Sequence, residues 1–201
     1  MPKPFCLLIC IMTLLSNGLL QAATAASSDS VYLDAANLPE DVRKFILPGT
    51  KPLALEIADL NRDNLNDYIL VLEKPEVEEE QRPLLILLRM ADGTLKLAKR
   101  NNKALYCSTC GGVMGDPFQG ISAGKGTFTI SHYGGSGWRW SVETKFNYSR
   151  RDKTWQLVQV INTSFHAGDP ENSTTKTHTP PKDFGKIDIA DFDPEHYLKK
   201  R

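Results

Sequence analysis

The feature that most limits the possible folds is a series of short apolar segments that turn residues separate at nearly regular intervals. The segments cover residues 53–57, 68–72, 84–88, 127–133, 138–148 and 155–161. Asp92-Gly93, followed by the alternating Leu95 and Leu97, is typical of a tight hairpin. Strands of this length and spacing favour antiparallel pairing in chain order. We therefore predict a mainly β fold, an antiparallel meander of about seven or more strands.

Other segments of the chain are predicted to lack strand structure. Residues 37–47 have the pattern of a short N-terminal helix, with Asn37 as its cap and Pro39 in its first turn. Residues 73–82 are acidic and are expected to form a solvated loop, whereas residues 167–182 are polar and are expected to form a long flexible loop. Apolar residues return in the tail, which is expected to pack back. Residues 26–201 are thus predicted to be a single β-rich domain.

The N-terminus has the pattern of a cleaved signal peptide, which we assign to residues 1–25. Lys3 gives a positive start, residues 5–15 are apolar, and Ala23-Thr24-Ala25 fits the rule of small residues before a cleavage site. The apolar run is shorter than the roughly 20 residues that a membrane-spanning helix needs. We therefore expect a soluble mature chain that begins at Ala26, is periplasmic or secreted, and has no transmembrane segment.

Charge and cysteine content narrow the class of partner and the redox compartment. The chain has 24 basic and 24 acidic residues, and this balance argues against nucleic acid as a partner. Two of the four cysteines, Cys6 and Cys10, belong to the predicted signal peptide. Export leaves Cys107 and Cys110 in an oxidising compartment, where we expect a disulfide bond between them. A redox-active pair is the alternative, but the glycines that follow Cys110 disfavour the helix that such a pair needs.

Residues 59–67 read Asp-Leu-Asn-Arg-Asp-Asn-Leu-Asn-Asp, with oxygen-bearing side chains at loop positions 1, 3, 5 and 9. Calcium takes six to eight oxygen ligands at roughly 2.3–2.6 Å, and alternate residues of a tight loop supply them. The predicted ligands are the side chains of Asp59, Asn61, Asp63 and Asp67 and the backbone carbonyl of Leu65. Asn64 stands where such loops need a left-handed residue. We predict a structural calcium ion here, and the alternative is a polar hairpin whose side chains cap backbone amides.

This loop resembles the calcium loops of FG-GAP and VCBS repeats, which occur in integrin-like propellers and in many secreted bacterial proteins. Their pattern is D-x-[DN]-x-D-G-x-x-D between two apolar strands, and here residues 53–58 and 68–72 supply the strands. The chain differs from the pattern at Asn64, where the family has Gly. Because the chain has one copy, the resemblance implies a calcium loop and not a propeller.

Aromatic residues and glycines are concentrated between positions 130 and 140. The candidate binding residues are His132, Tyr133, Trp138, Arg139 and Trp140. Strand alternation places the two tryptophans on one face and Arg139 on the other. An aromatic pair beside glycines is typical of a binding surface, and the alternative is a hairpin with two core tryptophans. Together with Gly115-Asp116-Pro117-Phe118, the run resembles a set of uncharacterised secreted bacterial proteins, which implies a domain outside the cytoplasm and no known activity.

These patterns favour an exported soluble binding protein with a structural calcium loop, whose partner is a protein or a cell-envelope component. One form of it is an inhibitor or immunity protein that blocks an envelope enzyme. The alternative is an envelope hydrolase or transferase that uses His132 and the glycine-rich segment 111–137. A pocket that holds His132 beside Asp116 or Ser136 would favour the enzyme, whereas exposed aromatic side chains would favour binding. The sequence assigns no catalytic residue.

Overall fold

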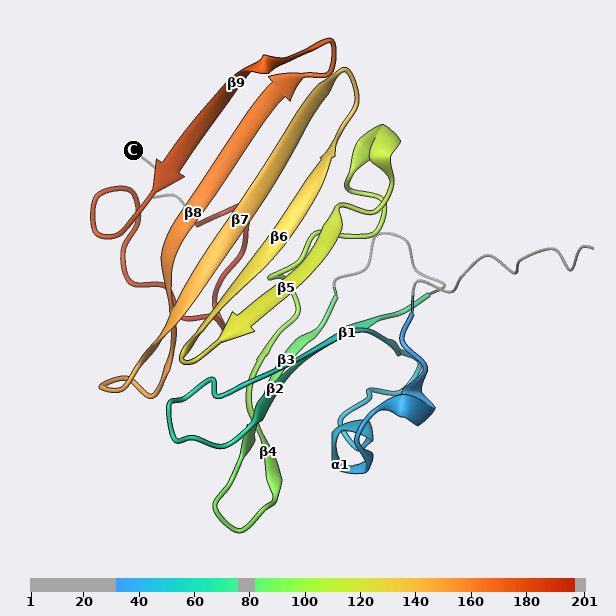
Figure 1. Ribbon diagram of the computed structural model, residues 1–201, viewed down its shortest axis with the longest axis vertical. Coiled ribbons are helices and arrows are strands. Elements are labelled where there is room, and N and C mark those ends of the chain that lie inside the picture. Colours follow the sequence, from blue (N-terminus) through green and yellow to red (C-terminus); the bar gives the residue numbers. More distant parts are fainter. Residues whose placement is uncertain (1–31, 76–81, 198–201) are drawn as a thin grey trace, which may run out of the picture. The chain divides into compact units, whose positions relative to one another are not determined.

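The computed structural model describes residues 32–75 and 82–197 and confirms the mainly β prediction. Two antiparallel sheets are present in this part of the chain, and each strand pairs with its neighbour in chain order (Figure 1). The four-stranded sheet contains β1 (Lys51–Ala58), β2 (Asp67–Glu73), β3 (Leu84–Arg89) and β4 (Leu95–Asn101). The five-stranded sheet contains β5 (Phe118–Gly124), β6 (Thr127–Gly135), β7 (Trp138–Ser149), β8 (Thr154–His166) and β9 (Asp169–His178).

Strands β2 and β3 are buried on both faces, which explains their unbroken apolar sequences. Along β2, Ile69 and Val71 belong to one cluster of buried side chains, while Leu70 and Leu72 belong to another. The first cluster also contains side chains of β6, β7 and β8, so the two sheets share one core. The second cluster lies under the N-terminal segment, which contributes Val42.

The N-terminal helix is much shorter than predicted. A 3-10 turn, η1 (Ala35–Asn37), comes first, and α1 (Glu40–Arg43) is a single helical turn. Asn37 does not cap α1, because the side chain of Asp34 caps η1 and Pro39 precedes α1 without a side-chain hydrogen bond. After Arg43 the N–H groups of Phe45 and Ile46 donate to carbonyls three residues earlier, at 2.9 and 3.1 Å, so the α-helical hydrogen-bond pattern does not continue. None of the helices in the described part of the chain has the length and apolar character needed to cross a membrane.

The predicted flexible loop at 167–182 is wrong, because most of it forms β9 on the edge of the five-stranded sheet. Thr163 of β8 pairs with Thr175 of β9, and their hydroxyl oxygens lie 3.0 Å apart. Nearly all side chains of β9 are exposed, so the strand needs no apolar residues. Its pairing with β8 holds it in place, and its polar side chains suit an exposed sheet edge.

The tail packs back against the core, as predicted. Phe184, Ile189 and Phe192 are buried in the cluster that the two sheets share. The backbone N–H of Ile189 donates to the carbonyl of Trp155, at 2.9 Å. The tail therefore covers part of the core-facing side of the five-stranded sheet.

The predicted signal peptide, residues 1–25, lies outside the described residues, together with Cys6 and Cys10. Export, cleavage before Ala26 and the compartment of the mature chain therefore stay predictions.

Candidate functional site

The loop between β1 and β2, residues 59–67, brings three carboxylates together. One carboxylate oxygen from each of Asp59, Asp63 and Asp67 lies within 4.8 Å of the others. Asn64 has a φ of 70°, as predicted for the left-handed position, and Arg62 has a φ of 66°. The backbone form and the convergence of three predicted ligands therefore agree with a cation loop.

Backbone amides hydrogen-bond to the same carboxylates. Asp59 accepts from the N–H groups of Asp63 (2.9 Å) and Asn64 (3.1 Å), and Asp63 accepts from the N–H of Leu65 (2.8 Å). Asn61 accepts from the N–H of Asp63 at 3.0 Å, and its amide donates to the Asp63 carboxylate at 2.8 Å. These are the bonds that the polar-hairpin alternative requires, and they also fix the carboxylates in place. The Leu65 carbonyl stays a predicted ligand.

Burial and a lysine set the charge balance of the loop. The buried carboxylate of Asp67 accepts from the N–H groups of Leu60 and Arg89, both at 2.9 Å, and burial raises the pKa of Asp67. Burial also acts to raise the pKa of Asp59, but hydrogen bonds from Lys125 and from backbone amides hold that pKa below its usual value. The Lys125 ammonium lies 3.3 Å from Asp59 Oδ2. The loop therefore attracts positive charge.

The same loop joins the two sheets. The carbonyl of Asp59 accepts from the N–H of Gly126 in the β5–β6 turn, at 2.8 Å. The carbonyl of Leu60 accepts from the indole N–H of the buried Trp155 in β8, at 2.9 Å. Gly126 has a φ of 71°, and a Cβ there would collide with the side chain of Arg62. An ion that held this loop in shape would stabilise the contact between the sheets.

Cys107 and Cys110 form the predicted disulfide. The bridge closes a short turn in which the N–H of Cys110 donates to the carbonyl of Cys107, at 3.1 Å. The segment then continues into the 3-10 turn η2 (Gly112–Met114). Because no α-helix begins at Cys107, the arrangement lacks the helix N-terminus that lowers the pKa of a redox-active thiol.

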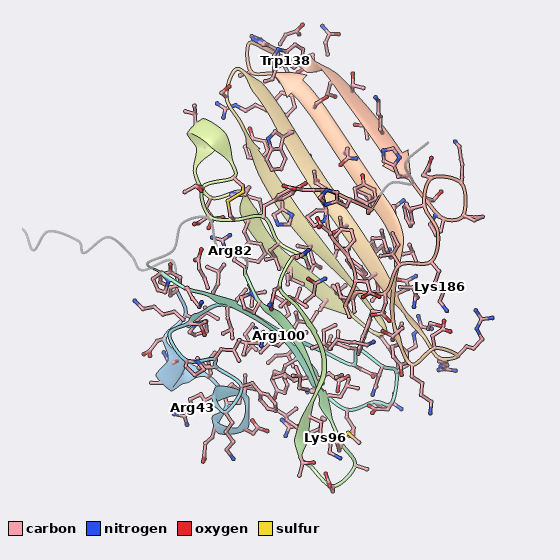
Figure 2. The ribbon with its side chains drawn as sticks, turned by 180° about the vertical axis from the view of Figure 1, so that it is seen from behind. Arg43, Arg82, Lys96, Arg100, Trp138 and Lys186 are labelled. Carbon is pink, nitrogen blue, oxygen red and sulfur yellow. A yellow bond between two sulfur atoms is a disulfide. The ribbon has the colours of Figure 1, made fainter. Side chains whose placement is uncertain are left out.

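The five predicted binding residues do not form one surface. Trp138 lies at the tip of the β6–β7 hairpin with 67% of its surface exposed (Figure 2), and Trp140 is half-buried. The two tryptophans share a face, as predicted, while alternation places Tyr133 and Arg139 on the opposite face. The alternative of two core tryptophans is also wrong, because the tryptophan that is buried in the core is Trp155.

His132 lies on the core side of β6 and is only 2% exposed. Its Nε2 accepts from the N–H of Tyr106 at 3.4 Å, and its Nδ1 has no hydrogen-bond partner among the described residues. Burial, reinforced by the positive charge of Arg82, lowers the pKa of His132 to about 4, although Asp116 opposes the shift. The imidazole is therefore neutral at physiological pH.

The structure does not bring together the triad of the enzyme alternative. Both carboxylate oxygens of Asp116 accept from the Arg82 guanidinium, at 2.7 and 2.6 Å. Ser136 follows the last residue of β6, in the turn before β7. Within the described part of the chain, neither residue hydrogen-bonds to His132. The geometry thus offers no nucleophile and base pair to support hydrolysis at His132.

A groove lies over β7, β8 and β9 of the five-stranded sheet, next to Tyr106 and Trp140. Two cavities of about 600 and about 490 Å³ adjoin, because both are lined by Tyr106, Cys110 and Glu195. Two cross-strand rows line the smaller cavity, Trp140 with Ser164 and Thr174, and Val142 with Asn162 and Lys176. Trp140 and Tyr106 form its aromatic wall, and the other side chains of the two rows form its floor. The disulfide turn and the tail form its walls. Of the five predicted binding residues, Trp140 lines this groove. His132 lines neither of the two cavities.

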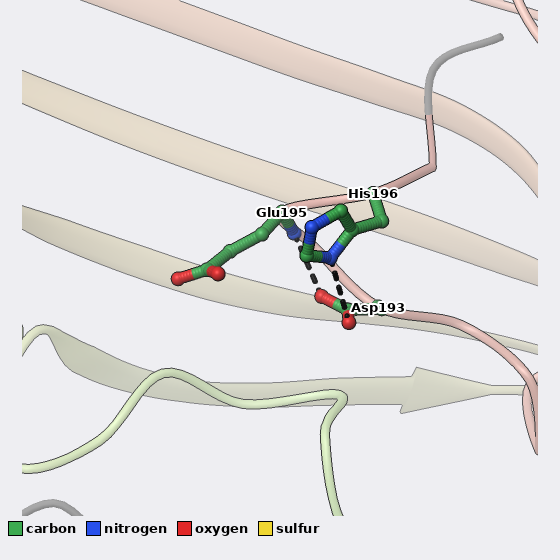
Figure 3. A group of neighbouring side chains, drawn as sticks. All are labelled: Asp193, Glu195 and His196. Atoms are coloured by element: carbon green, nitrogen blue, oxygen red, sulfur yellow. Dashed lines mark hydrogen bonds and ion pairs between the residues drawn. The ribbon is translucent and has the colours of Figure 1, made fainter. Parts of the chain in front are cut away.

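A further cluster in the tail was missed by the sequence analysis. Asp193, Glu195 and His196 bring carboxylate and imidazole atoms within 4.8 Å of one another (Figure 3). Asp193 accepts from the N–H of Glu195 at 2.9 Å and lies 3.0 Å from His196 Nδ1, so Asp193 closes the turn. The Asp-Pro-Glu-His run is visible in the sequence, but its place along the groove depends on the tertiary structure.

The chain matches no protein-family model, and no curated protein or solved structure is detectably similar to it.

Proposed function

We propose that this chain is an exported binding protein whose partner is a protein or a cell-envelope component, with a structural calcium ion in the loop 59–67. The groove over β7, β8 and β9 supports binding, since it is concave and combines an aromatic wall with polar side chains. Binding is preferred to hydrolysis because His132 is buried and is not hydrogen-bonded to Asp116 or Ser136. An inhibitor or immunity protein is one form of this function.

The calcium ion is supported by the convergence of Asp59, Asp63 and Asp67. Three carboxylates at this separation repel one another, and a divalent cation with oxygen ligands offsets the repulsion. Calcium fits the proposed export because it is abundant outside cells. Since the loop contacts both sheets and does not line the groove, the ion would act on stability rather than on the partner.

Calcium is expected to raise the melting temperature of protein that has been treated with a chelator. With free calcium at about 100 times its dissociation constant, linkage gives roughly 2.7 kcal/mol of added stability. Asp63→Asn should abolish the shift, because the amide retains hydrogen-bonding atoms but loses the charge. Circular dichroism melts with calcium and with chelator measure the effect.

Asp191→Asn is the matched control, since Asp191 is an exposed carboxylate outside the loop, and it should keep the full shift. Lys125→Gln should bind calcium more tightly, because the ammonium that competes for Asp59 is removed. Identical wild-type melts with calcium and with chelator would eliminate the ion from the proposal.

Cell fractionation tests export and binding together. The chain is expected to co-sediment with washed cell envelopes, and its intact mass should correspond to a product that begins at Ala26. Ala25→Arg should block cleavage, because the site requires a small residue. A full-length chain found in the cytosol, with Cys107 and Cys110 as free thiols, would contradict the proposal.

A further inference from the structure

We infer that the groove over β7, β8 and β9 binds a pyranose ring of a glycan, held between the aromatic wall of Trp140 and Tyr106 and the polar floor of the sheet. The inference deepens the proposed function, on which it rests, by giving the ligand a chemical class.

Trp140 and Tyr106 give the groove a fixed aromatic wall. Trp140 pairs across the strands with Gly134, and a Cβ at Gly134 would come within 2.6 Å of the indole Cζ2. The indole therefore lies directly against the glycine backbone. Tyr106 meets it edge-on, with ring centroids 5.5 Å apart and an interplanar angle of 64°. Rings that are already ordered lose little entropy on binding, and the C–H groups of a pyranose pack well against an aromatic face.

The glycine-rich segment explains how this wall is held. The N–H of Gly135 donates to the carbonyl of Gly111 at 2.8 Å, so the segment after the disulfide is fixed to the end of β6. A Cβ at Gly134 would also come within 2.9 Å of the Gly111 Cα. Larger residues at either position would separate the segment from β6. Tyr106, which directly precedes Cys107, is thereby kept close to Trp140.

The floor offers hydrogen bonds that suit the hydroxyl groups of a sugar. The amide NH₂ of Asn162 donates to the hydroxyl oxygen of Tyr197 in the tail, at 2.9 Å. The side-chain carbonyl oxygen of Asn162 can accept a hydrogen bond from a ligand. The hydroxyl groups of Ser164 and Thr174 are exposed, and the described residues give them no hydrogen-bond partner. Lys176 adds a donor and Glu195 adds an acceptor to the lining. Hydroxyl groups both donate and accept, so a sugar matches this mixed set.

The lining disfavours other classes of ligand. The smaller cavity is lined by one lysine and one glutamate, so it has no excess of positive charge for a nucleic acid or another polyphosphate. Hydroxyl and amide groups on its floor disfavour an acyl chain, because these groups would lose their hydrogen bonds to water. Cavities of about 490 and about 600 Å³ are in the size range of small-ligand sites.

The test is a titration of the full purified chain with soluble oligosaccharides, followed by calorimetry. One arm uses a tetramer of N-acetylglucosamine and the other a glucose tetramer, which separates acetamido sugars from plain hexoses. We expect saturable binding in at least one arm and at least a tenfold loss of affinity for Trp140→Ala. Trp138→Ala is the matched control, because Trp138 is exposed outside the groove, and it should keep the wild-type affinity.

A second variant, Thr174→Val, covers the case in which Trp140→Ala does not fold. It removes one exposed hydroxyl group from an edge strand and should also weaken binding. Absence of binding in both arms, or equal losses in Trp138→Ala and Trp140→Ala, would overturn the glycan inference. If the sugars do not bind but envelope co-sedimentation still requires Trp140, the ligand class is wrong and the proposed function stands. If the wild type does not co-sediment either, both fail.

Discussion

Arg82→Met is expected to lower the free energy of unfolding by about 3–5 kcal/mol, because it leaves two carboxylates without the cation that they share. Arg82 is fully buried, and Glu73 is 6% exposed. Nε and Nη2 of Arg82 donate to Glu73 Oε1 at 2.9 and 2.6 Å, and the two terminal nitrogens donate to Asp116 at 2.7 and 2.6 Å. Figure 2 shows Arg82 among the surrounding side chains.

The position of this ion network explains the size of the effect. It joins the end of β2, the segment before β3 and the segment before β5, and so connects both sheets. Burial acts to lower the pKa of Arg82, but the hydrogen bonds to Asp116 and Glu73 raise that pKa above its usual value. The guanidinium is therefore charged, and without it each carboxylate is left partly desolvated.

Chemical denaturation should show this loss, and the melting temperature should fall by roughly 10 °C. Arg43→Met removes an exposed arginine and is expected to change stability by less than about 0.5 kcal/mol. Adding Glu73→Gln to Arg82→Met should recover part of the loss, because burying a neutral amide costs less than burying a lone carboxylate. A loss below about 1 kcal/mol for Arg82→Met would show that the network is solvated.

The same network shows why local composition misled the prediction at Glu73 and Arg82, the two ends of residues 73–82; residues 76–81 lie outside the described residues. The stretch is acidic and was interpreted as a solvated loop, yet Glu73 and Arg82 at its two ends are both buried. Their charges are compensated by each other and by Asp116, which is 34 residues beyond Arg82. The composition of residues 73–82 includes Glu73 and Arg82 but not Asp116, the distant partner that permits their burial.

Strands could be predicted where burial leaves a pattern in the sequence, and not where pairing alone forms them. β2 and β3 are apolar because both of their faces are buried, and β3 and β4 are joined at the predicted place by a turn in which Gly93 has a φ of 84°. β9 has no such pattern because an edge strand needs only its neighbour's backbone. β5 was also missed, since Gly120 and Gly124 interrupt its alternation.

The candidate sites differ in the same way. The loop 59–67 could be predicted because its carboxylates converge within nine consecutive residues. The groove could not, because its lining depends on the register of three strands, which sets Trp140 beside Ser164 and Ser164 beside Thr174. Its walls also require the tail to pack back on the sheet.

The burial of His132 could have been predicted from the sequence. Phe128, Ile130 and His132 alternate along β6, and the first two are core residues, so period-two alternation already places the histidine toward the core. In the structure its ring contacts Tyr106, with centroids 4.9 Å apart, and Phe118, at 6.1 Å. The sequence analysis gives His132 as a candidate binding residue, and the buried position of its ring does not fit that prediction.

Burial of His132 predicts that the protein loses stability as the pH falls from 6.5 toward 4. The folded-state pKa of about 4 lies below the usual value of 6.5, so between these limits the unfolded chain binds more protons than the folded one. Above pH 6.5 the imidazole is neutral in both states and contributes no change. The difference in pKa corresponds to about 3 kcal/mol across the window, and most of it is lost by pH 4.5.

Urea unfolding of the wild type and His132→Phe at pH 7.0 and 4.5 measures this contribution. Carboxylates titrate in the same window, so the quantity that matters is the difference in pH dependence between the two proteins. His132→Phe should be the less pH-sensitive protein by about 2–3 kcal/mol, even if the lost acceptor for the Tyr106 N–H lowers its stability at both pH values. His166→Asn removes an exposed histidine and should behave as the wild type does. Equal pH dependence in the wild type and His132→Phe would mean that the folded protein accepts a proton at His132 without cost. In that case the ring would have access to water and could take part in acid–base chemistry.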